Sequence, residues 1–166
     1  IGRQAGTVMT TNTANIVIGH GAMDAAVAGE DYNVAIGINA LSAENSNANY
    51  CVAIGQDALA LQTYDSKNTA IGALAGDAIT TAGNNTFIGY RAGSLQSTAA
   101  GSPGHSNNTA VGHDAYLAGT GLRNTIMGAL AGDAAMSGWD NTCLGYSAGS
   151  ALTTGGSSVG GNTLIG

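Results

Sequence analysis

The chain has 166 residues and a formal net charge of −6, with only 8% charged and 5% aromatic residues. Its basic residues, Arg3, Lys67, Arg91 and Arg123, are too few and too scattered to neutralise a phosphate backbone, which excludes nucleic acid as an expected partner. No apolar run approaches the length of a membrane-spanning helix, about 18 residues, so membrane insertion is not expected either.

A five-residue phrase returns roughly every 17 residues along the whole chain. It consists of asparagine, a β-branched residue, a small or apolar residue, a large aliphatic residue and glycine. A disordered chain of similar composition has no reason to space its aliphatic residues at a fixed interval. The pattern predicts one all-β array over residues 1–166, a parallel β-solenoid or β-roll of about ten coils. The repeat glycines are Gly2, Gly19, Gly37, Gly55, Gly72, Gly89, Gly112, Gly128, Gly145 and Gly166.

The ends and the insertions of the array describe its organisation. Ile1-Gly2 and Leu164-Ile165-Gly166 both lie inside a repeat, so we expect an array excised from a longer chain. The two longest intervals between repeat glycines, 23 and 21 residues, place loop insertions near 97–107 and 153–161. Insertions at one point of a coil map to one outer edge, where recognition could be grafted.

The phrase begins with an asparagine in eight of its nine full copies, and Cys51 is the exception. Each asparagine alone would be an ordinary turn residue. Stacked coils lie about 4.8 Å apart, so amides in register can hydrogen-bond along the stack. The sequence therefore predicts an asparagine ladder that comprises Asn15, Asn33, Asn68, Asn85, Asn108, Asn124, Asn141 and Asn162.

The next residues predict a strand of four to five residues in each coil. The residue before each repeat glycine is large and aliphatic, and the residue two positions earlier is β-branched, which favours pleated backbone. Residues two apart in a strand share a face. We expect both columns to point into the coil, with a structural core of Ile18, Ile36, Ile54, Ile71, Ile88, Val111, Met127, Leu144 and Ile165.

The residue between these two columns points to the opposite face of the strand. It is apolar in every copy, whereas a solvent-facing column would be polar. Since a narrow solenoid has only one inside, a second buried face needs another partner, and a copy of the same chain is the simplest one. The predicted subunit interface comprises Val17, Ala35, Ala53, Ala70, Phe87, Ala110, Ile126, Cys143 and Leu164.

An alanine stands three residues after every repeat glycine except Gly166, which is the last residue of the sequence. A further apolar residue often follows three positions later, so this part of the coil could be a short helix. Glycine directly after the alanine, as at Gly6, Gly76 and Gly93, favours a corner instead.

The phrases NTAIG at 68–72, NTFIGYRAG at 85–93, NTAVGHDA at 108–115 and NTCLGYSAG at 141–149 resemble two related repeat families. One is the NTAIGYxAG repeat of phage tail fibres, and the other is the head repeat of trimeric autotransporter adhesins. The resemblance implies a left-handed β-roll in a homotrimer, with two further copies as partners, used for attachment to a cell surface. It implies an extracellular location, on a virion tail fibre or a bacterial cell. Coils of about 17 residues with insertions favour the phage-fibre type.

The chain offers no residue set for catalysis, a metal or a cofactor, and we expect none of the three. His20 and His113 lie five coils apart, and so do Cys51 and Cys143, which is too far for shared ligation or an intrachain disulfide. Neither a carboxylate pair nor a nucleophile motif is evident. Aromatic and polar residues of variable segments and corners could contact a glycan or protein receptor, or pack on the next coil; these are Tyr64, His105, Tyr116 and Trp139.

These features favour a non-enzymatic fibre segment, a trimeric shaft or head used in host adhesion. The alternatives are a bacterial adhesin head that binds matrix or glycan, and an ice-binding solenoid, suggested by the threonine column from Thr69 to Thr163. Ice-binding faces usually carry two threonine columns on an exposed flat surface. We expect this column to face inward beside the isoleucines, which disfavours ice binding.

Overall fold

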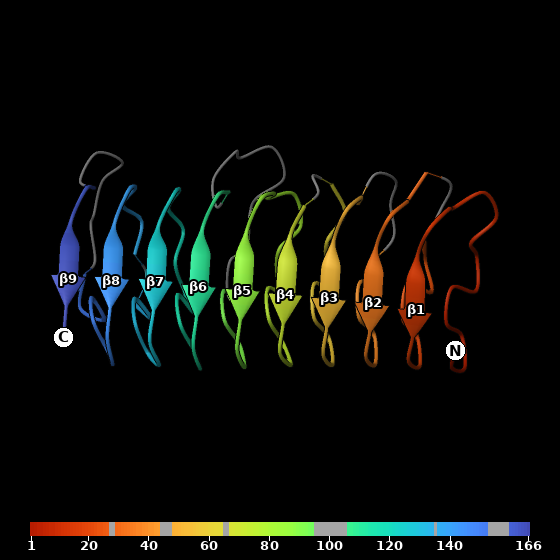
Figure 1. The fold of residues 1–166 in the computed structure, drawn as a ribbon, viewed down its shortest axis with the longest axis horizontal. Helices are drawn as coiled ribbons and strands as arrows, with labels where there is room; N and C mark the ends of the chain where they lie inside the picture. The colour runs from red at the N-terminus through yellow and green to blue at the C-terminus, as the bar shows by residue number, and fades with distance from the viewer. Residues whose placement is uncertain (27–28, 44–47, 65–66, 95–105, 135, 153–159) are drawn as a thin grey trace.

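The computed structural model describes residues 1–26, 29–43, 48–64, 67–94, 106–134, 136–152 and 160–166. Within these ranges there is no helix, and nine parallel strands form one sheet whose spatial order follows the sequence (Figure 1). The chain is therefore an all-β parallel solenoid, as the repeat predicts, and the segment after each glycine is a corner. The strands are β1 Ile16–Ile18, β2 Val34–Ile36, β3 Val52–Ile54, β4 Thr69–Ile71, β5 Thr86–Ile88, β6 Thr109–Val111, β7 Thr125–Met127, β8 Thr142–Leu144 and β9 Thr163–Ile165.

Each strand covers three residues rather than the expected four or five. The hydrogen-bond ladder nevertheless extends one residue beyond both ends of a strand: the Gly37 amide donates to the Ile18 carbonyl at 2.8 Å, and the Asn33 carbonyl accepts from the Ile16 amide at 2.8 Å. The strand ends where the repeat glycine takes a φ between +127° and +143°, a conformation that side-chain-bearing residues rarely adopt.

One turn of the solenoid is here called a rung and is named by its strand. The repeat glycine determines how closely each rung packs on the next. A Cβ built on Gly55 would lie 2.5 Å from the carbonyl oxygen of Gly72, and equivalent contacts occur along the stack. Only glycine allows this approach, so its invariance has two causes, backbone conformation and contact between rungs. The longer interval before β6 leaves the register intact, since Thr86 still pairs with Thr109.

The inside of the solenoid is the opposite of the one that the sequence analysis assigned. The middle residue of each strand from β2 to β8 is fully buried in a single chain, so it faces the core and cannot contact another subunit. The predicted interface is thus wrong for Ala35, Ala53, Ala70, Phe87, Ala110, Ile126 and Cys143, and Val17 and Leu164 are half-buried in the same column. The predicted core is wrong as well, because Ile18, Ile36, Ile54, Ile71, Ile88, Val111, Met127, Leu144 and Ile165 lie on the outer face, exposed or half-buried.

A narrow interior explains this reversal. The middle strand residue packs against the corner, where the alanine three residues after the glycine is also buried, as at Ala58 and Ala115. The space between strand and corner holds about one large side chain in each rung. A whole column of isoleucines would overfill it, whereas alternation of large and small side chains fills it at native density.

The bulk in each rung is shared between two positions six residues apart. Where the middle strand residue is alanine, as at Ala53, the residue four after the glycine is large in every rung from β2 to β8 except that of β4; here it is the buried Leu59. Where the strand residue is large, as at Phe87, that corner residue is glycine, and a Cβ on Gly93 would lie 2.8 Å from the Phe87 ring. Other pairs of this kind are Ala35 with Leu41, Ala110 with Tyr116, Ile126 with Gly132 and Cys143 with Gly149.

The asparagine ladder expected from the sequence is present. Each ladder Oδ1 except that of Asn162 accepts from the backbone amide at the ladder position of the next rung, as in the 2.8 Å bond from Asn85 N to Asn68 Oδ1 and the 2.9 Å bond from Asn141 N to Asn124 Oδ1. Most ladder Nδ2 groups donate to a carbonyl oxygen of the next rung or to the preceding ladder Oδ1. The remaining links join Asn15 to Asn33, Asn33 to Cys51, Asn85 to Asn108, Asn108 to Asn124 and Asn141 to Asn162.

Candidate interaction surface

The outer face of the sheet is a strip with two columns of side chains. One column holds Ile16, Val34 and Val52 and then threonine from β4 onward, and the other is the aliphatic column before the repeat glycines. Six of the aliphatic side chains are between 37% and 77% exposed, although each is apolar; they are Ile18, Ile71, Ile88, Met127, Leu144 and Ile165. Neither column contains a charged residue.

The size of this strip can be estimated from strand geometry. Nine strands about 4.8 Å apart make it about 38 Å long, and the two columns lie about 7 Å apart. Figure 1 shows the strands side by side along the long axis of the molecule. With side-chain width included, the strip covers on the order of 400 Å², which matches the largest apolar patches of typical monomers.

Two columns of corner residues flank the strip, and both carry exposed aromatic side chains. On the side of the asparagines, Tyr32 and Tyr50 stack on adjacent rungs with ring centroids 5.0 Å apart and an interplanar angle of 4°. On the side of the glycines, Tyr90 stacks on His113 at 5.4 Å, and Tyr146 follows two rungs later. None of these five residues is among the predicted receptor contacts, although two recurring phases, one directly before the ladder position and one directly after the repeat glycine, are a signal that could have identified them.

Two arginines on the flanks pair with carboxylates. Arg123 donates to both carboxylate oxygens of Asp140, at 2.7 and 2.9 Å, and its guanidinium lies 5.9 Å from the Trp139 ring centroid. The hydrogen bond from Arg123 lowers the pKa of Asp140. On the other flank, Asp114 Oδ1 is buried 3.5 Å from Arg91 Nε. The flanks therefore form a polar rim around an apolar centre, an arrangement typical of protein interfaces.

The four predicted receptor contacts have different outcomes in the structure. Tyr64 and Trp139 are 49% and 39% exposed and remain available to a partner. Tyr116 is fully buried, so this prediction is wrong: its hydroxyl accepts from Gly121 N at 2.8 Å and from Asn124 Nδ2 at 2.9 Å. The ring fills the space opposite Ala110, and burial raises the pKa of the phenol. His105 and nearly all of both insertions lie outside the described residues.

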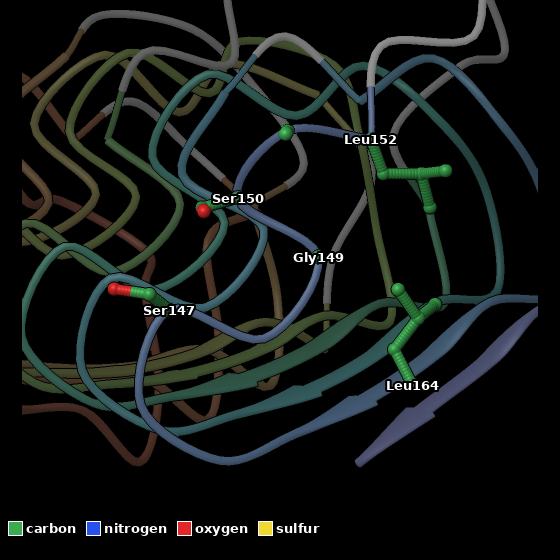
Figure 2. A pocket seen from close by; sticks show the side chains of 6 residues that line it. Ser147, Gly149, Ser150, Leu152 and Leu164 are labelled. Atoms are coloured by element: carbon green, nitrogen blue, oxygen red, sulfur yellow. The ribbon is translucent and has the colours of Figure 1, made fainter. Parts of the chain in front are cut away.

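An open hollow of about 380 Å³ lies beside the last two strands. Figure 2 shows Leu152 and Leu164 on one side of it and the hydroxyls of Ser147 and Ser150 on the other. Gly149 and Ala151 complete the lining, which contains no titratable side chain. Nothing in this lining supplies an acid, a base or a metal ligand.

The described residues contain no metal cluster and no membrane-spanning helix. In these ranges no three His, Cys, Asp or Glu side chains come together as they would around a metal ion. Across the same part of the chain, the structure has no helix that could cross a membrane. Burial raises the pKa of both Cys51 and Cys143, which lie inside the solenoid as free thiols.

Comparison with protein-family models, curated proteins and solved structures found no match to this chain.

Proposed function

We propose that this chain is a non-enzymatic structural and attachment segment, a β-solenoid that assembles with two further copies into an extracellular fibre. The apolar outer strip carries this proposal, because it exposes isoleucine, leucine and methionine side chains over the full length of the sheet. The resemblance to phage-fibre repeats supplies the number three and the role in host attachment. A bacterial adhesin head is the alternative within the same assembly.

The area of the outer face is consistent with burial against other copies. The strip and its flanks together measure about 20 by 38 Å, or on the order of 800 Å², which equals the area that each partner contributes to a standard interface. The outer face thus combines an exposed aliphatic column with a column that is threonine from β4 onward, and the inner and outer sides of the strand are exchanged relative to the expectation from the sequence.

The two flanks also differ in a way that favours parallel copies in matching register. In a parallel cyclic assembly, the asparagine-side flank of one copy meets the glycine-side flank of its neighbour at the same rung. From β4 to β8 these flanks pair a large side chain with a smaller one in nearly every rung. The pairs are Lys67 with Ala73, Asn84 with Tyr90, Asn107 with His113, Arg123 with Ala129, and Asp140 with Tyr146.

Molar mass in solution, measured by light scattering, tests the assembly. We expect a mass near three chains, and a double variant Ile71→Lys with Ile88→Glu should reduce it to one chain. These two residues pair across β4 and β5, so the opposite charges support each other within one chain. The control Val8→Lys with Leu61→Glu changes exposed residues outside the strands and should leave the mass unchanged. A wild-type chain that is monomeric at high micromolar concentration would remove the proposal.

Receptor binding is tested separately with a glycan array. Exposed aromatic side chains on the flanks and edges, such as Tyr64 and Trp139, suit a sugar or protein receptor. We expect binding that falls when both are replaced by alanine while the molar mass stays constant. Unchanged binding would leave only the role of a shaft.

Ice binding is a second candidate that one observation favours. The threonine column from Thr69 to Thr163 faces outward, not inward as expected, and it lies beside an aliphatic column. A thermal-hysteresis assay decides between ice binding and fibre assembly. It compares the wild type with a double variant of the outer strip, Thr109→Lys with Thr125→Glu. Hysteresis in a monomer that the variant abolishes would favour ice over assembly.

A further inference from the structure

The outer strip changes in character along the solenoid. In the β1–β3 rungs both of its columns are aliphatic, because Ile16, Val34 and Val52 stand where threonine stands from β4 onward. Ile16 and Ile18 are 52% and 40% exposed. Each later rung keeps a hydroxyl on the strip, which can bind water, whereas the first three rungs present only hydrocarbon there. The strip therefore has one end that is fully apolar and one where aliphatic and hydroxyl columns lie side by side.

The flanks of the strip divide at the same point. Beside the β2 and β3 rungs they carry Tyr32 and Tyr50 on one side and Ile38 on the other, and these side chains are between 50% and 57% exposed. The flank positions of the β1–β3 rungs, all within the described ranges, contain no lysine, arginine, aspartate or glutamate, whereas those of the later rungs include Arg123 and Asp140. Removal of charged groups from water is costly, so the β1–β3 end is the part of this face that is easiest to bury.

The two tyrosines are already ordered within a single chain. Their rings are parallel to within 4°, and the ring centroids are 5.0 Å apart. A side chain that is held in place before association loses less conformational entropy when it binds. In the proposed parallel assembly, Tyr32 faces Ile38 of the neighbouring copy, and Tyr50 faces Gln56. The pair thus offers a preformed aromatic surface to a neighbouring copy, and tyrosine is one of the residues that most often dominate binding energy in protein interfaces.

We propose that the β1–β3 rungs anchor the assembly: copies of this chain bind one another most tightly there, and the rungs from β4 onward add a weaker, hydrated contact. The occupant of this end is a second copy, because the apolar end continues the strip on which the later rungs meet. Its two flanks also complement each other rung by rung. This inference rests on the proposed assembly and adds where along the solenoid the binding energy lies.

Isosteric exchanges between valine and threonine test the anchor. The measured quantity is the chain concentration at which half of the assembly has dissociated, followed by light scattering on dilution. Val34→Thr with Val52→Thr places two hydroxyls of every copy in the apolar end and should raise this concentration about 100-fold. The reverse exchange, Thr109→Val with Thr125→Val, should change it less than about threefold, because those positions stay hydrated. Equal and opposite shifts from the two variants would overturn the anchor and leave the assembly in place.

A second pair of variants tests the anchor through the flanks, including the case in which the threonine variant folds poorly. Tyr32→Ala with Tyr50→Ala changes only exposed side chains and should raise the same concentration at least about tenfold. Tyr90→Ala with His113→Ala removes the other stacked pair, in the β5 and β6 rungs, and should have a smaller effect. Equal effects of the two flank variants would overturn the anchor. A wild-type chain that stays monomeric would instead remove the assembly and the anchor with it.

Discussion

The β3 and β5 rungs fill the same interior in opposite ways. In the β3 rung the strand contributes the small Ala53 and the corner contributes Leu59, whereas in the β5 rung the strand contributes Phe87 and the corner contributes Gly93. Both rungs stack at the same register between identical glycine contacts. The difference teaches that the fold limits the total side-chain volume inside a rung. Either the strand residue or the corner residue can supply that volume.

The β4 rung shows that neighbours also share this space. Its strand and corner residues, Ala70 and Gly76, are both small. A Cβ on Gly76 would lie 3.0 Å from Leu59, 3.2 Å from Phe87 and 3.3 Å from Ile79. Side chains of the rungs on either side therefore reach into the β4 rung, and a change in one rung is felt in the next.

Removal of the Phe87 ring should have the largest effect. Phe87→Ala removes the ring that lies against Gly93 and beside Gly76, so a cavity opens across two rungs. We expect the free energy of unfolding in urea to fall by about 3–5 kcal/mol. Phe87→Leu, which keeps most of the volume, should cost clearly less. Equal costs for the two variants would show that volume does not limit this core.

Addition of bulk at the corner should have the next largest effect. Gly93→Leu places a side chain where the Phe87 ring lies and should cost about 2–3 kcal/mol. The backbone itself accepts leucine, since Leu59 has a φ of 50° at the same phase.

The double variant Phe87→Ala with Gly93→Leu recreates the arrangement of the β3 rung. It should be more stable than the sum of the single changes by about 1–3 kcal/mol in a double-mutant cycle. Strictly additive costs would refute the exchange of bulk between strand and corner.

Tyr116 differs from the other large residues four positions after a repeat glycine, Met23, Leu41 and Leu59, because its side chain carries a hydroxyl. Tyr116→Phe keeps the ring but leaves Gly121 N without its acceptor. We expect thermal unfolding to report a loss of about 1–2 kcal/mol. Tyr116→Leu at the same site would test packing separately. No change in Tm for the phenylalanine variant would mean that another group replaces the hydroxyl.

The smallest effect is expected at Ile126, where one methyl group is removed. Ile126→Val leaves Gly132 and Met136 close by to fill part of the space, so the cost should be about 0.5–1.5 kcal/mol. The same substitution on the outer strip, Ile88→Val, should change the stability of one chain even less. A larger effect outside than inside would contradict the assignment of the two faces.

The repeat phase was enough to predict the stack, the register and the asparagine ladder. Each depends on residues that must match from rung to rung, such as Asn68 with Asn85, and such matches are visible in a sequence. The inner and outer faces could not be predicted from residue size. Ile54 is larger and more apolar than Ala53, and burial preference favours the larger residue, but the narrow interior reverses this order.

A subtler sequence signal did point to the inner face. Ala110 with Tyr116 and Phe87 with Gly93 vary in opposite directions six residues apart, which indicates that the two positions share one space. The same phase would have placed Tyr116 with the buried Leu41 and Leu59 instead of with receptor contacts.

The contact between successive repeat glycines determines how the length of the solenoid grows. Gly89 and Gly112 touch as closely as Gly55 and Gly72, although 23 residues separate the first pair and 17 the second. Every glycine therefore advances the rod by one strand spacing, about 4.8 Å, whatever the intervening segment contains. Evolution can enlarge or replace the displayed loops without altering how far the rod extends, and its length can be counted directly in glycines.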